Sequence, residues 1–278
     1  MLRKIIFLFL IYSLPVQYIL ADGIIKEQTL STSQGKTLNV KADCGDVTVS
    51  TWNKSEAYIK ISGNDNAKDN MTFKISEKDG DIFVTAGKSQ GVEALKNVNL
   101  KIEVNIPDKF NTSIATAGGD ITLGDLTGSV NMKTAGGDID LRNINGNANL
   151  KTAGGDVKIE SINGNVSAKT AGGNINITAS DGSIKAKTAG GDITIKYNGE
   201  IQGMDLSTSG GNVNLYIPEN SSAKVELTAT SGEINSDFPL TSNVNKLVNH
   251  KMSGDIGSGG ELIKCKTLGG NISLEKIK

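Results

Sequence analysis

The chain has 278 residues, with 29 basic residues, 30 acidic residues, a single histidine and two cysteines. One histidine excludes a metal site built from several histidines, and the near balance of charge excludes the strongly basic class of nucleic-acid-binding proteins. Aromatic residues make up only 4% of the chain, which leaves little material for the aromatic subsites of a carbohydrate-active enzyme.

Residues 1–21 have the layout of a secretory signal peptide. Arg3 and Lys4 precede an apolar run at residues 5–20, which Pro15 interrupts and which ends in a small residue before Asp22. The alternative is an uncleaved membrane anchor, but the run is short for a bilayer span of about 20 residues. We therefore expect an exported mature chain without a transmembrane segment.

Removal of residues 1–21 leaves 27 basic residues against 30 acidic residues, and Arg142 is then the only arginine. A surface for nucleic acid needs a basic stripe, preferably rich in arginine. We therefore expect no nucleic-acid partner.

Residues 22–115 alternate apolar and polar residues in short runs separated by Gly, Asn, Asp and Lys, a pattern typical of β-strands. The runs follow no fixed period, so we predict an irregular β-sheet module that caps one end of the repeats that follow. Residues 64–70 and 88–97 are predicted loops, the second with a short helical turn at residues 92–96. The predicted strands are residues 38–40, 46–50, 57–62, 71–76, 81–86 and 98–106.

Residues 116–215 contain a repeated block, Thr-Ala-Gly-Gly-Asp/Asn-Ile/Val, which becomes Thr-Ser-Gly-Gly-Asn-Val in its last copy. A fixed period indicates one structural unit stacked on copies of itself. In the first unit, residues 119–123 and 128–132 each begin with glycine and alternate apolar and polar residues, so one repeat supplies two short strands. The paired glycines and the apolar spacing of two exclude a helix. The first five copies are 18 residues apart, and the blocks begin at Thr116, Thr134, Thr152, Thr170, Thr188 and Thr208.

Stacking at this period places like residues above one another in columns. Four inward columns are aliphatic, and one outward column, Lys133, Lys151, Lys169 and Lys187, stays charged, which fixes the register because a slip of one residue would bury every lysine. We therefore predict an all-β fold, a parallel β-solenoid with about 18 residues and two short strands per coil, in which each coil needs its neighbours. The inward columns are Ile121, Ile139, Val157, Ile175, Ile193 and Val213; Leu123, Leu141, Ile159, Ile177, Ile195 and Leu215; Leu126, Ile144 and Ile162; and Val130, Ala148, Val166 and Ile184.

Residues 216–278 repeat more loosely. The second glycines of successive blocks, Gly191, Gly211, Gly232, Gly254 and Gly270, are 20, 21, 22 and 16 residues apart. We expect one coil for each, stacked in chain order, with extra residues in loops at Pro218, residues 238–239 and residues 243–249. Residues 262–274 form the predicted last coil, and residues 275–278 supply charge at the exposed end. Loops on a rigid stack are favoured positions for binding.

Several of these segments together carry a resemblance. Leu38-Asn39-Val40 precedes Gly45-Asp46-Val47-Thr48-Val49, the run at residues 98–107 ends in Asn105-Ile106-Pro107, and Gly-Gly-Asp-Ile then repeats. With these motifs the chain resembles the bacterial putative-adhesin family of extracytoplasmic β-repeat domains of unknown function. The resemblance covers most of the mature chain and implies a fold and an exported location. It provides no catalytic or ligand residues.

The residue after each glycine pair forms an outward row of carboxylates and amides. Carboxylates about 4.8 Å apart repel each other by about 1 kcal/mol in water, so something offsets the repulsion. One hypothesis is a calcium ladder on Asp120, Asp138, Asp156 and Asp192. The hypothesis that we favour is that each carboxylate accepts turn N–H groups, because the calcium-binding nonapeptide pattern has a third glycine that this repeat lacks. The row is Asp120, Asp138, Asp156, Asn174, Asp192, Asn212, Glu233, Asp255 and Asn271.

The threonines that begin the blocks, from Thr116 to Thr208, allow two interpretations. They could form a flat hydroxyl array that binds a crystalline or polymeric surface, or they could pack at the corners with hydroxyls bonded along the column, which we favour. Trp52 and Tyr58 could stack on a sugar ring, but we favour a structural role for them too. His250 lies in a predicted late loop.

The two cysteines, Cys44 and Cys265, lie near opposite ends of the predicted stack, too far apart for a disulfide. We therefore expect two unpaired, buried thiols. Cys265 occupies the position of Met132 in its repeat and should face inward.

The repeat holds no nucleophile–base pair, no metal-ligand cluster and no phosphate-binding loop. We therefore predict no catalytic residue and no cofactor. The predicted function is that of an exported, noncatalytic structural or adhesive protein, in the periplasm, on the outer surface or secreted, whose partner is a cell-surface or envelope polymer or protein. The alternatives are a polysaccharide-active β-helix enzyme, with its site in the late loops, and a periplasmic scaffold in an envelope-stress or signalling system. The domain boundaries are 1–21 for the signal peptide, 22–115 for the capping module and 116–278 for the repeats, regular to residue 215.

Overall fold

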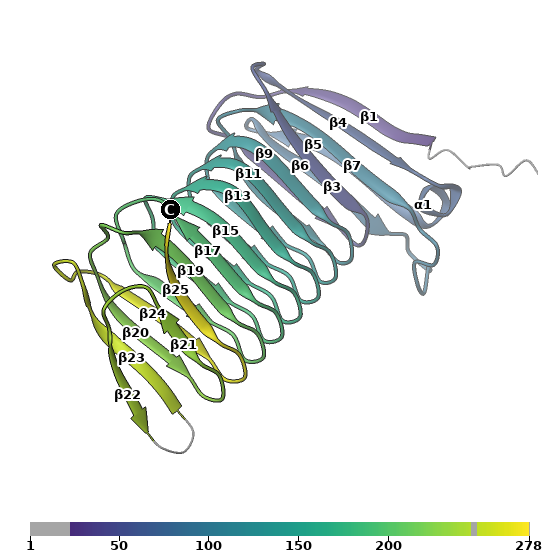
Figure 1. Ribbon diagram of the computed structural model, residues 1–278. Helices are drawn as coiled ribbons and strands as arrows, with labels where there is room; N and C mark the ends of the chain where they lie inside the picture. The colour runs from purple at the N-terminus through teal and green to yellow at the C-terminus, as the bar shows by residue number, and fades with distance from the viewer. Residues whose placement is uncertain (1–22, 246–248, 278) are drawn as a thin grey trace, which may run out of the picture.

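A computed structural model describes residues 23–245 and 249–277. The predicted signal peptide, residues 1–21, lies outside the described residues. The described chain winds as a solenoid in which the repeated coils each give one strand to each of two long sheets (Figure 1). The predicted all-β, parallel solenoid is therefore confirmed.

Sheet A has twelve strands. In their order across the sheet they are β1 (Gly23–Ser31), β4 (Glu56–Gly63), β7 (Leu100–Pro107), β3 (Asp46–Trp52), β9 (Ile121–Thr127), β11 (Ile139–Asn145), β13 (Val157–Asn163), β15 (Ile175–Ser180), β17 (Ile193–Tyr197), β19 (Val213–Pro218), β25 (Ile272–Ile277) and β21 (Ile234–Ser236).

Sheet B has thirteen strands. In order they are β22 (Thr241–Asn245), β23 (Asn249–Ile256), β20 (Ala223–Ala229), β24 (Leu262–Thr267), β18 (Met204–Ser207), β16 (Ile184–Lys187), β14 (Val166–Lys169), β12 (Ala148–Lys151), β10 (Val130–Lys133), β8 (Asn111–Thr116), β2 (Thr37–Ala42), β6 (Asp81–Lys88) and β5 (Met71–Lys78).

The predicted aliphatic columns are the core. Ile139 pairs in register with Ile121 on one side and Val157 on the other, and the columns of Leu123, Leu126 and Val130 continue in the same way. Alternation alone would not place both Leu141 and Ile144 inside, three residues apart. Asn143 adopts a positive φ of 49° between them, which restores the inward orientation of Ile144.

The second glycine of each block is required by the distance between coils. A Cβ atom added to Gly137 would lie 2.1 Å from the carbonyl oxygen of Gly119 in the preceding coil. The first glycine is different, because a Cβ atom on Gly136 meets nothing closer than 3.8 Å. Only the second glycine therefore sets how closely two coils can stack.

At the N-terminal end both sheets continue beyond the repeats. Strands β3 and β7 extend sheet A, and β2 and β6 extend sheet B, all in parallel pairing. Antiparallel strands then end the sheets, β4 and β1 in sheet A and β5 in sheet B. All six predicted strands of this region are present.

One detail of this region was predicted wrongly. The short helix is α1 (Asp65–Asn70), inside a predicted loop, and residues 92–96 are not helical. Asn64 explains the position, because its side-chain oxygen accepts a hydrogen bond from the Ala67 N–H and caps the helix. Residues 89–97 instead form an irregular connection, which Lys88 holds through a bond from its Nζ to the Glu93 carbonyl oxygen (2.9 Å).

The order of the late coils also differs from the prediction. Strands β24 and β25 form one coil, and this coil lies between the coil of β18 and β19 and the coil of β20 and β21. In Figure 1 the yellow strand β25 lies directly beside β19, with β21 beyond it. Residues 275–277 therefore do not form the exposed end of the stack, contrary to the sequence-based expectation.

The end of sheet B is an antiparallel hairpin, β22 and β23, which pairs with β20. Gly254 and Asp255 belong to β23 and begin no parallel coil, so that prediction was wrong. His250 lies in β23 rather than in a loop, and its Nδ1 lies 2.7 Å from the Gly232 carbonyl oxygen.

Both cysteines are unpaired, as predicted. Cys265 is 1% exposed and pairs in register with Leu206 in the column that contains Met132, and burial raises the pKa of its thiol to about 12. Cys44 is only half-buried, contrary to expectation, because it precedes the turn at Gly45 and lies beside Met71, with 3.7 Å between the two sulfur atoms.

Candidate binding surfaces

The outer side of sheet B carries the predicted lysine column, Lys133, Lys151, Lys169 and Lys187. These residues pair in register along β10, β12, β14 and β16. Successive strands lie about 4.8 Å apart, so each ammonium group repels the next by about 1 kcal/mol in water. The sequence predicted both the column and its outward direction, and the structure confirms them.

Little negative charge offsets this column. Lys187 pairs with Asp205 at 2.9 Å, whereas Lys133, Lys151 and Lys169 take part in no ion pair with any described residue. Further lysines extend the same side of sheet B, which we call the basic face, and Asp205 and Glu226 are the acidic side chains within its strands from β2 to β20. The basic face comprises Lys41, Lys133, Lys151, Lys169, Lys185, Lys187, Lys224, Lys264 and Lys266.

A second outward column runs beside the lysines. Asn131, Asn149 and Ser167 each lie two residues before a lysine on the same strand and pair in register across the sheet. Residues two apart on a strand share a face and are about 6.6 Å apart. The face therefore alternates an ammonium group with an amide or a hydroxyl group, which donates and accepts hydrogen bonds.

The predicted acidic row lies at the corner between the sheets, and it is tied to the backbone. Each Oδ1 atom accepts a hydrogen bond from the backbone N–H of the equivalent residue in the next coil: Asp120 accepts from Asp138 (2.8 Å), Asp138 from Asp156 (2.7 Å) and Asp156 from Asn174 (2.6 Å). Asp192 accepts in the same way from Asn212 at 2.6 Å. Such bonds lower the free energy of the charged carboxylate, which offsets the repulsion along the row.

The row differs from its predicted membership at the late coils. It begins at Asp46, whose Oδ1 accepts from Asp120, and it ends with Asn212, Asn271 and Glu233 in that order, without Asp255. Within residues 23–245 and 249–277, no group of three His, Cys, Asp or Glu side chains is arranged to hold a metal ion. The calcium ladder stays a hypothesis that a melting experiment can decide.

The threonines that begin the blocks are buried at the corner. The Oγ1 atom of Thr152 donates to the Gly137 carbonyl oxygen at 2.8 Å and accepts from the Gly155 N–H at 3.2 Å, so one hydroxyl joins two coils. Thr134, Thr170, Thr188 and Thr208 make the same pair of bonds. The packing interpretation is confirmed, and an exposed hydroxyl array is wrong.

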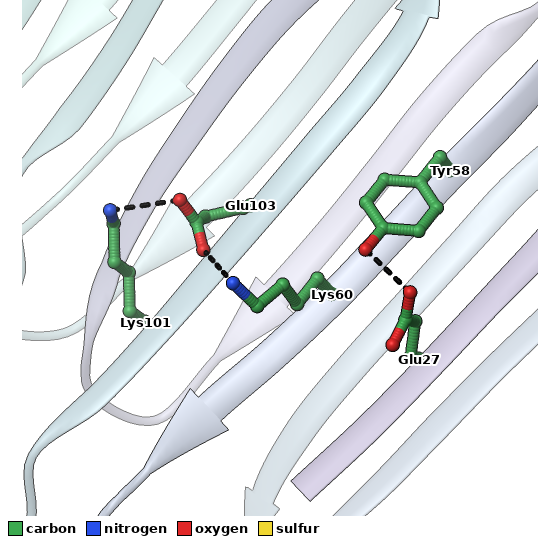
Figure 2. A network of polar contacts seen from close by, with 5 residues as sticks. All are labelled: Glu27, Tyr58, Lys60, Lys101 and Glu103. Atoms are coloured by element: carbon green, nitrogen blue, oxygen red, sulfur yellow. Dashed lines mark hydrogen bonds and ion pairs between the residues drawn. The ribbon is translucent and has the colours of Figure 1, made fainter. Parts of the chain in front are cut away.

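The outer side of sheet A contrasts with the basic face, because its charges are paired. Figure 2 shows Glu103 between two lysines, at 3.3 Å from Lys60 and 2.9 Å from Lys101. The hydrogen bond from Lys101 is the main cause that holds the pKa of Glu103 below its ordinary value. Nearby, Tyr58 donates to Glu27 at 2.7 Å, and this bond raises the pKa of Tyr58.

Trp52 and Tyr58, the residues considered for sugar stacking, lie in this neighbourhood with ring centroids 6.5 Å apart. The Nζ atom of Lys54 lies 4.3 Å from the centroid of the Trp52 ring, and the Trp52 indole N–H donates to the Glu56 carbonyl oxygen at 2.8 Å. A ring face already covered by a cation of the same chain is a poor platform for a sugar.

The late loops form a cleft, as far as loops were predicted there. It has a volume of about 690 Å³ and lies where three connections meet, before β18, after β19 and before β24. Glu200 and Glu261 line it together with the small polar residues Ser221, Ser222 and Ser258, and no aromatic side chain does. A polysaccharide-active enzyme would place its carboxylates here, but the cleft lacks aromatic subsites.

The sequence missed the extent of the basic face. Lys266 pairs in register with Ser207, and Lys264 with Asp205, so the late coil extends the face next to β18. The alternation of residues 262–266 predicted their outward direction, but the expected order of the coils placed them elsewhere. The alternation at residues 131, 149 and 167 already contained the second column.

Comparison with known proteins gives the family and the fold. A profile of the Toastrack DUF4097 family matches residues 37–275, so the predicted relationship to an adhesin-like family of unknown function is confirmed. A search of curated proteins found no match. No helix among the described residues has the length and apolar character needed to cross a membrane.

Several solved structures are similar over most of the chain. A putative adhesin from Bacteroides fragilis is 18% identical, with 91% of this chain and 96% of that chain covered and a TM-score of 0.47. A putative adhesin from Parabacteroides distasonis is 11% identical, with the same coverages and a TM-score of 0.43. A putative lipid binding protein from the same species is 14% identical, again over 91% and 96% of the chains, with a TM-score of 0.45.

Proposed function

We propose that this chain, which belongs to the Toastrack DUF4097 family, is an exported, noncatalytic β-solenoid that acts as a structural or adhesive protein of the cell surface or envelope. The N-terminal layout of Arg3 and Lys4 before an apolar run supports export. The repeated coils support the noncatalytic, surface-presenting role.

The observation that carries the proposal is the filled interior between the sheets. In one coil Ile139, Leu141 and Leu150 are 0% exposed, Ile144 is 2% exposed and Ala148 is 4% exposed. A ligand has no space there, so contacts with other molecules must use the outside. The outside consists of two sheets with side chains repeated from coil to coil, and such extended surfaces suit another surface or a polymer, whereas small substrates are usually enclosed in concave pockets.

Export is tested by expressing the full chain in a bacterium with an outer membrane, followed by fractionation and mass measurement of the mature protein. We expect an extracytoplasmic protein that has lost residues 1–21. Retention of the uncleaved chain in the cytoplasm would contradict the proposal. A processed protein that stays in the periplasm and co-purifies with an envelope-stress or signalling component would favour the scaffold alternative.

The noncatalytic part is tested by incubating the purified protein with acidic and neutral glycans and measuring new reducing ends and unsaturated products. We expect no turnover. The informative variants are Glu200→Gln and Glu261→Gln in the late-loop cleft, with Glu226→Gln on the basic face as the matched control. Turnover that is abolished in a cleft variant and kept in the control would make the protein an enzyme.

A further inference from the structure

We propose that the basic face binds a linear acidic polysaccharide, laid along the stack so that its carboxylates meet the lysine column. This inference rests on the proposed function, because it names the partner of a surface-presenting solenoid. It commits to one class of polymer, and the reasons lie in the arrangement of charge, in the column beside it and in what the face lacks.

The first reason is unbalanced charge on a fixed lattice. Lys133, Lys151 and Lys169 lie in register without an acidic partner among the described residues, although each repels its neighbours. On sheet A, by contrast, the lysines near Glu103 and Glu160 are paired with those carboxylates. One face of the same rod therefore leaves its positive charge available to a partner with a complementary row of negative charges.

The second reason is the column of Asn131, Asn149 and Ser167. A polysaccharide carries hydroxyl groups between its charged groups, and amide and hydroxyl side chains are suitable hydrogen-bond partners for them. Asn149 donates through Nδ2 to the Oδ1 of Asn131 at 3.3 Å, so these side chains are already held along the stack. The lysines would supply attraction, and this column would supply directional contacts to the sugar.

The third reason separates a glycan from a nucleic acid, which is also a linear polyanion. Proteins that bind single-stranded nucleic acid stack bases on aromatic side chains, and duplex binders use arginine extensively. The face has lysine instead of arginine and has no aromatic residue among the β10, β12, β14 and β16 strands. Lysine is a point charge that does not require the bidentate geometry of a phosphate.

The experiment measures binding of the full chain to polygalacturonate, which has one carboxylate on each sugar, with dextran as the neutral control polymer. The test variant changes Lys133, Lys151, Lys169 and Lys187 to Gln. A second variant changes Lys60, Lys101, Lys158 and Lys196 on sheet A to Gln, which alters the net charge equally. All eight side chains lie on the outside of the sheets, so both variants should keep the melting temperature, which is measured in parallel.

We expect polygalacturonate to bind and dextran not to bind, with affinity that falls as salt rises. The lysine-column variant should bind at least on the order of tenfold more weakly, because four exposed charge contacts are lost, and the sheet A variant should lose less than about twofold. Equal binding of dextran, or equal loss in both variants, would overturn the proposal. Single-stranded DNA is included as a probe, and DNA binding that exceeds polygalacturonate binding and disappears in the lysine-column variant would overturn the assignment to a glycan.

The outcome is independent of the tests of the proposed function. An exported, inactive protein that ignores polygalacturonate leaves the solenoid as a surface protein with another partner, and rejects only the glycan. A protein retained in the cytoplasm rejects the proposed function, whatever it binds in solution.

Discussion

The regular stack, residues 121–218, and the late coils, residues 223–277, use the same structural unit with different connections. In the regular stack each coil lies on the coil that precedes it in the chain, as β11 lies on β9 and β13 lies on β11. In the late coils β25 lies between β19 and β21, so spatial order and chain order differ. Both regions keep the inward columns, since Val213 pairs with Ile272 and Ile272 with Ile234.

The difference teaches that the repeat specifies a coil and its register but not its neighbour. A parallel pair of strands recognises the opposite edge through backbone groups and through the inward residues. Any two coils of this protein satisfy both conditions. The connections before and after a coil therefore decide where in the stack it lies.

The largest expected effect is an all-or-none crosslink that tests the order directly. In a background of Cys44→Ser and Cys265→Ala, Asn214→Cys combined with Ser273→Cys should form a disulfide on mild oxidation, because these residues are register partners in adjacent strands. Asn214→Cys combined with Asn235→Cys should not, because β25 separates them and the distance is about 9.6 Å. The crosslink is read from gel mobility, and the opposite result would restore stacking in chain order.

The next largest effect comes from a charge inside the core. Ile175→Asp places a carboxylate at a residue that is 0% exposed in the regular stack, and Ile272→Asp does the same in the late coils. Each should cost several kcal/mol of unfolding free energy, on the order of 3 to 5 kcal/mol. Thermal melting provides the measurement, and Asn176→Asp, whose side chain faces outward, is the control. A variant at position 175 that melts like the parent would contradict the inward columns.

A smaller loss should follow from the spacing of the coils. Gly137→Ala would place a Cβ atom 2.1 Å from the Gly119 carbonyl oxygen, so the coils must separate locally, with a loss on the order of 3 kcal/mol. Gly136→Ala has no atom within 3.8 Å and should change stability by less than about 1 kcal/mol. Chemical denaturation of the pair gives both values. Equal losses would mean that the two glycines act through the backbone conformation and not through stacking.

The fourth prediction concerns local opening. Cys265 is 1% exposed, and its pKa near 12 keeps it as a thiol, so alkylation at pH 8 requires exposure of the coil. The control is Ala168→Cys in the same column of the regular stack, with Cys44→Ser in both proteins and Cys265→Ala in the control. Because stability in a repeat stack falls toward its ends, Cys265 should react on the order of tenfold faster than the cysteine at position 168. Equal rates would mean that both regions open only by global unfolding.

The smallest expected effect is that of calcium on the acidic row. Asp120, Asp138 and Asp156 each give an Oδ1 atom to a backbone N–H, so stability should not depend on a cation. Melting in millimolar calcium and in a chelator should give the same temperature. A rise in calcium that Asp138→Asn abolishes would show that a metal bridges the coils.

The regular stack could be predicted almost completely because one period of 18 residues fixes all of its contacts. Ile121, Leu123 and Lys133 each recur at that period, and the register pairs recur with them. The Asp row and the buried threonines followed from the same regularity. The candidate basic face was half visible, because Lys133 to Lys187 repeat regularly whereas Lys264 and Lys266 join the face only through the exchanged order of the coils.

The late order could not be predicted because the signal for a coil carries no address. Gly254 was mistaken for the start of a coil since Ser-Gly-Asp-Ile resembles Gly-Gly-Asp-Ile, yet Ser253 stands where the first glycine should be, and β23 runs antiparallel to β20. The position of α1 depended on one side chain, Asn64, which a count of loop residues overlooks.

The exchanged coil sets a sequence of events for the newly made protein. Residues 223–236 meet their final neighbours only after residues 262–277 exist, because β24 and β25 occupy the space between them and the preceding coil. If β20 and β21 docked earlier, they would find on β18 and β19 the same apolar edge and would form a shortcut that has to reopen. A chain that winds up as it leaves a narrow exit would thus complete this rod by insertion rather than by adding a last rung.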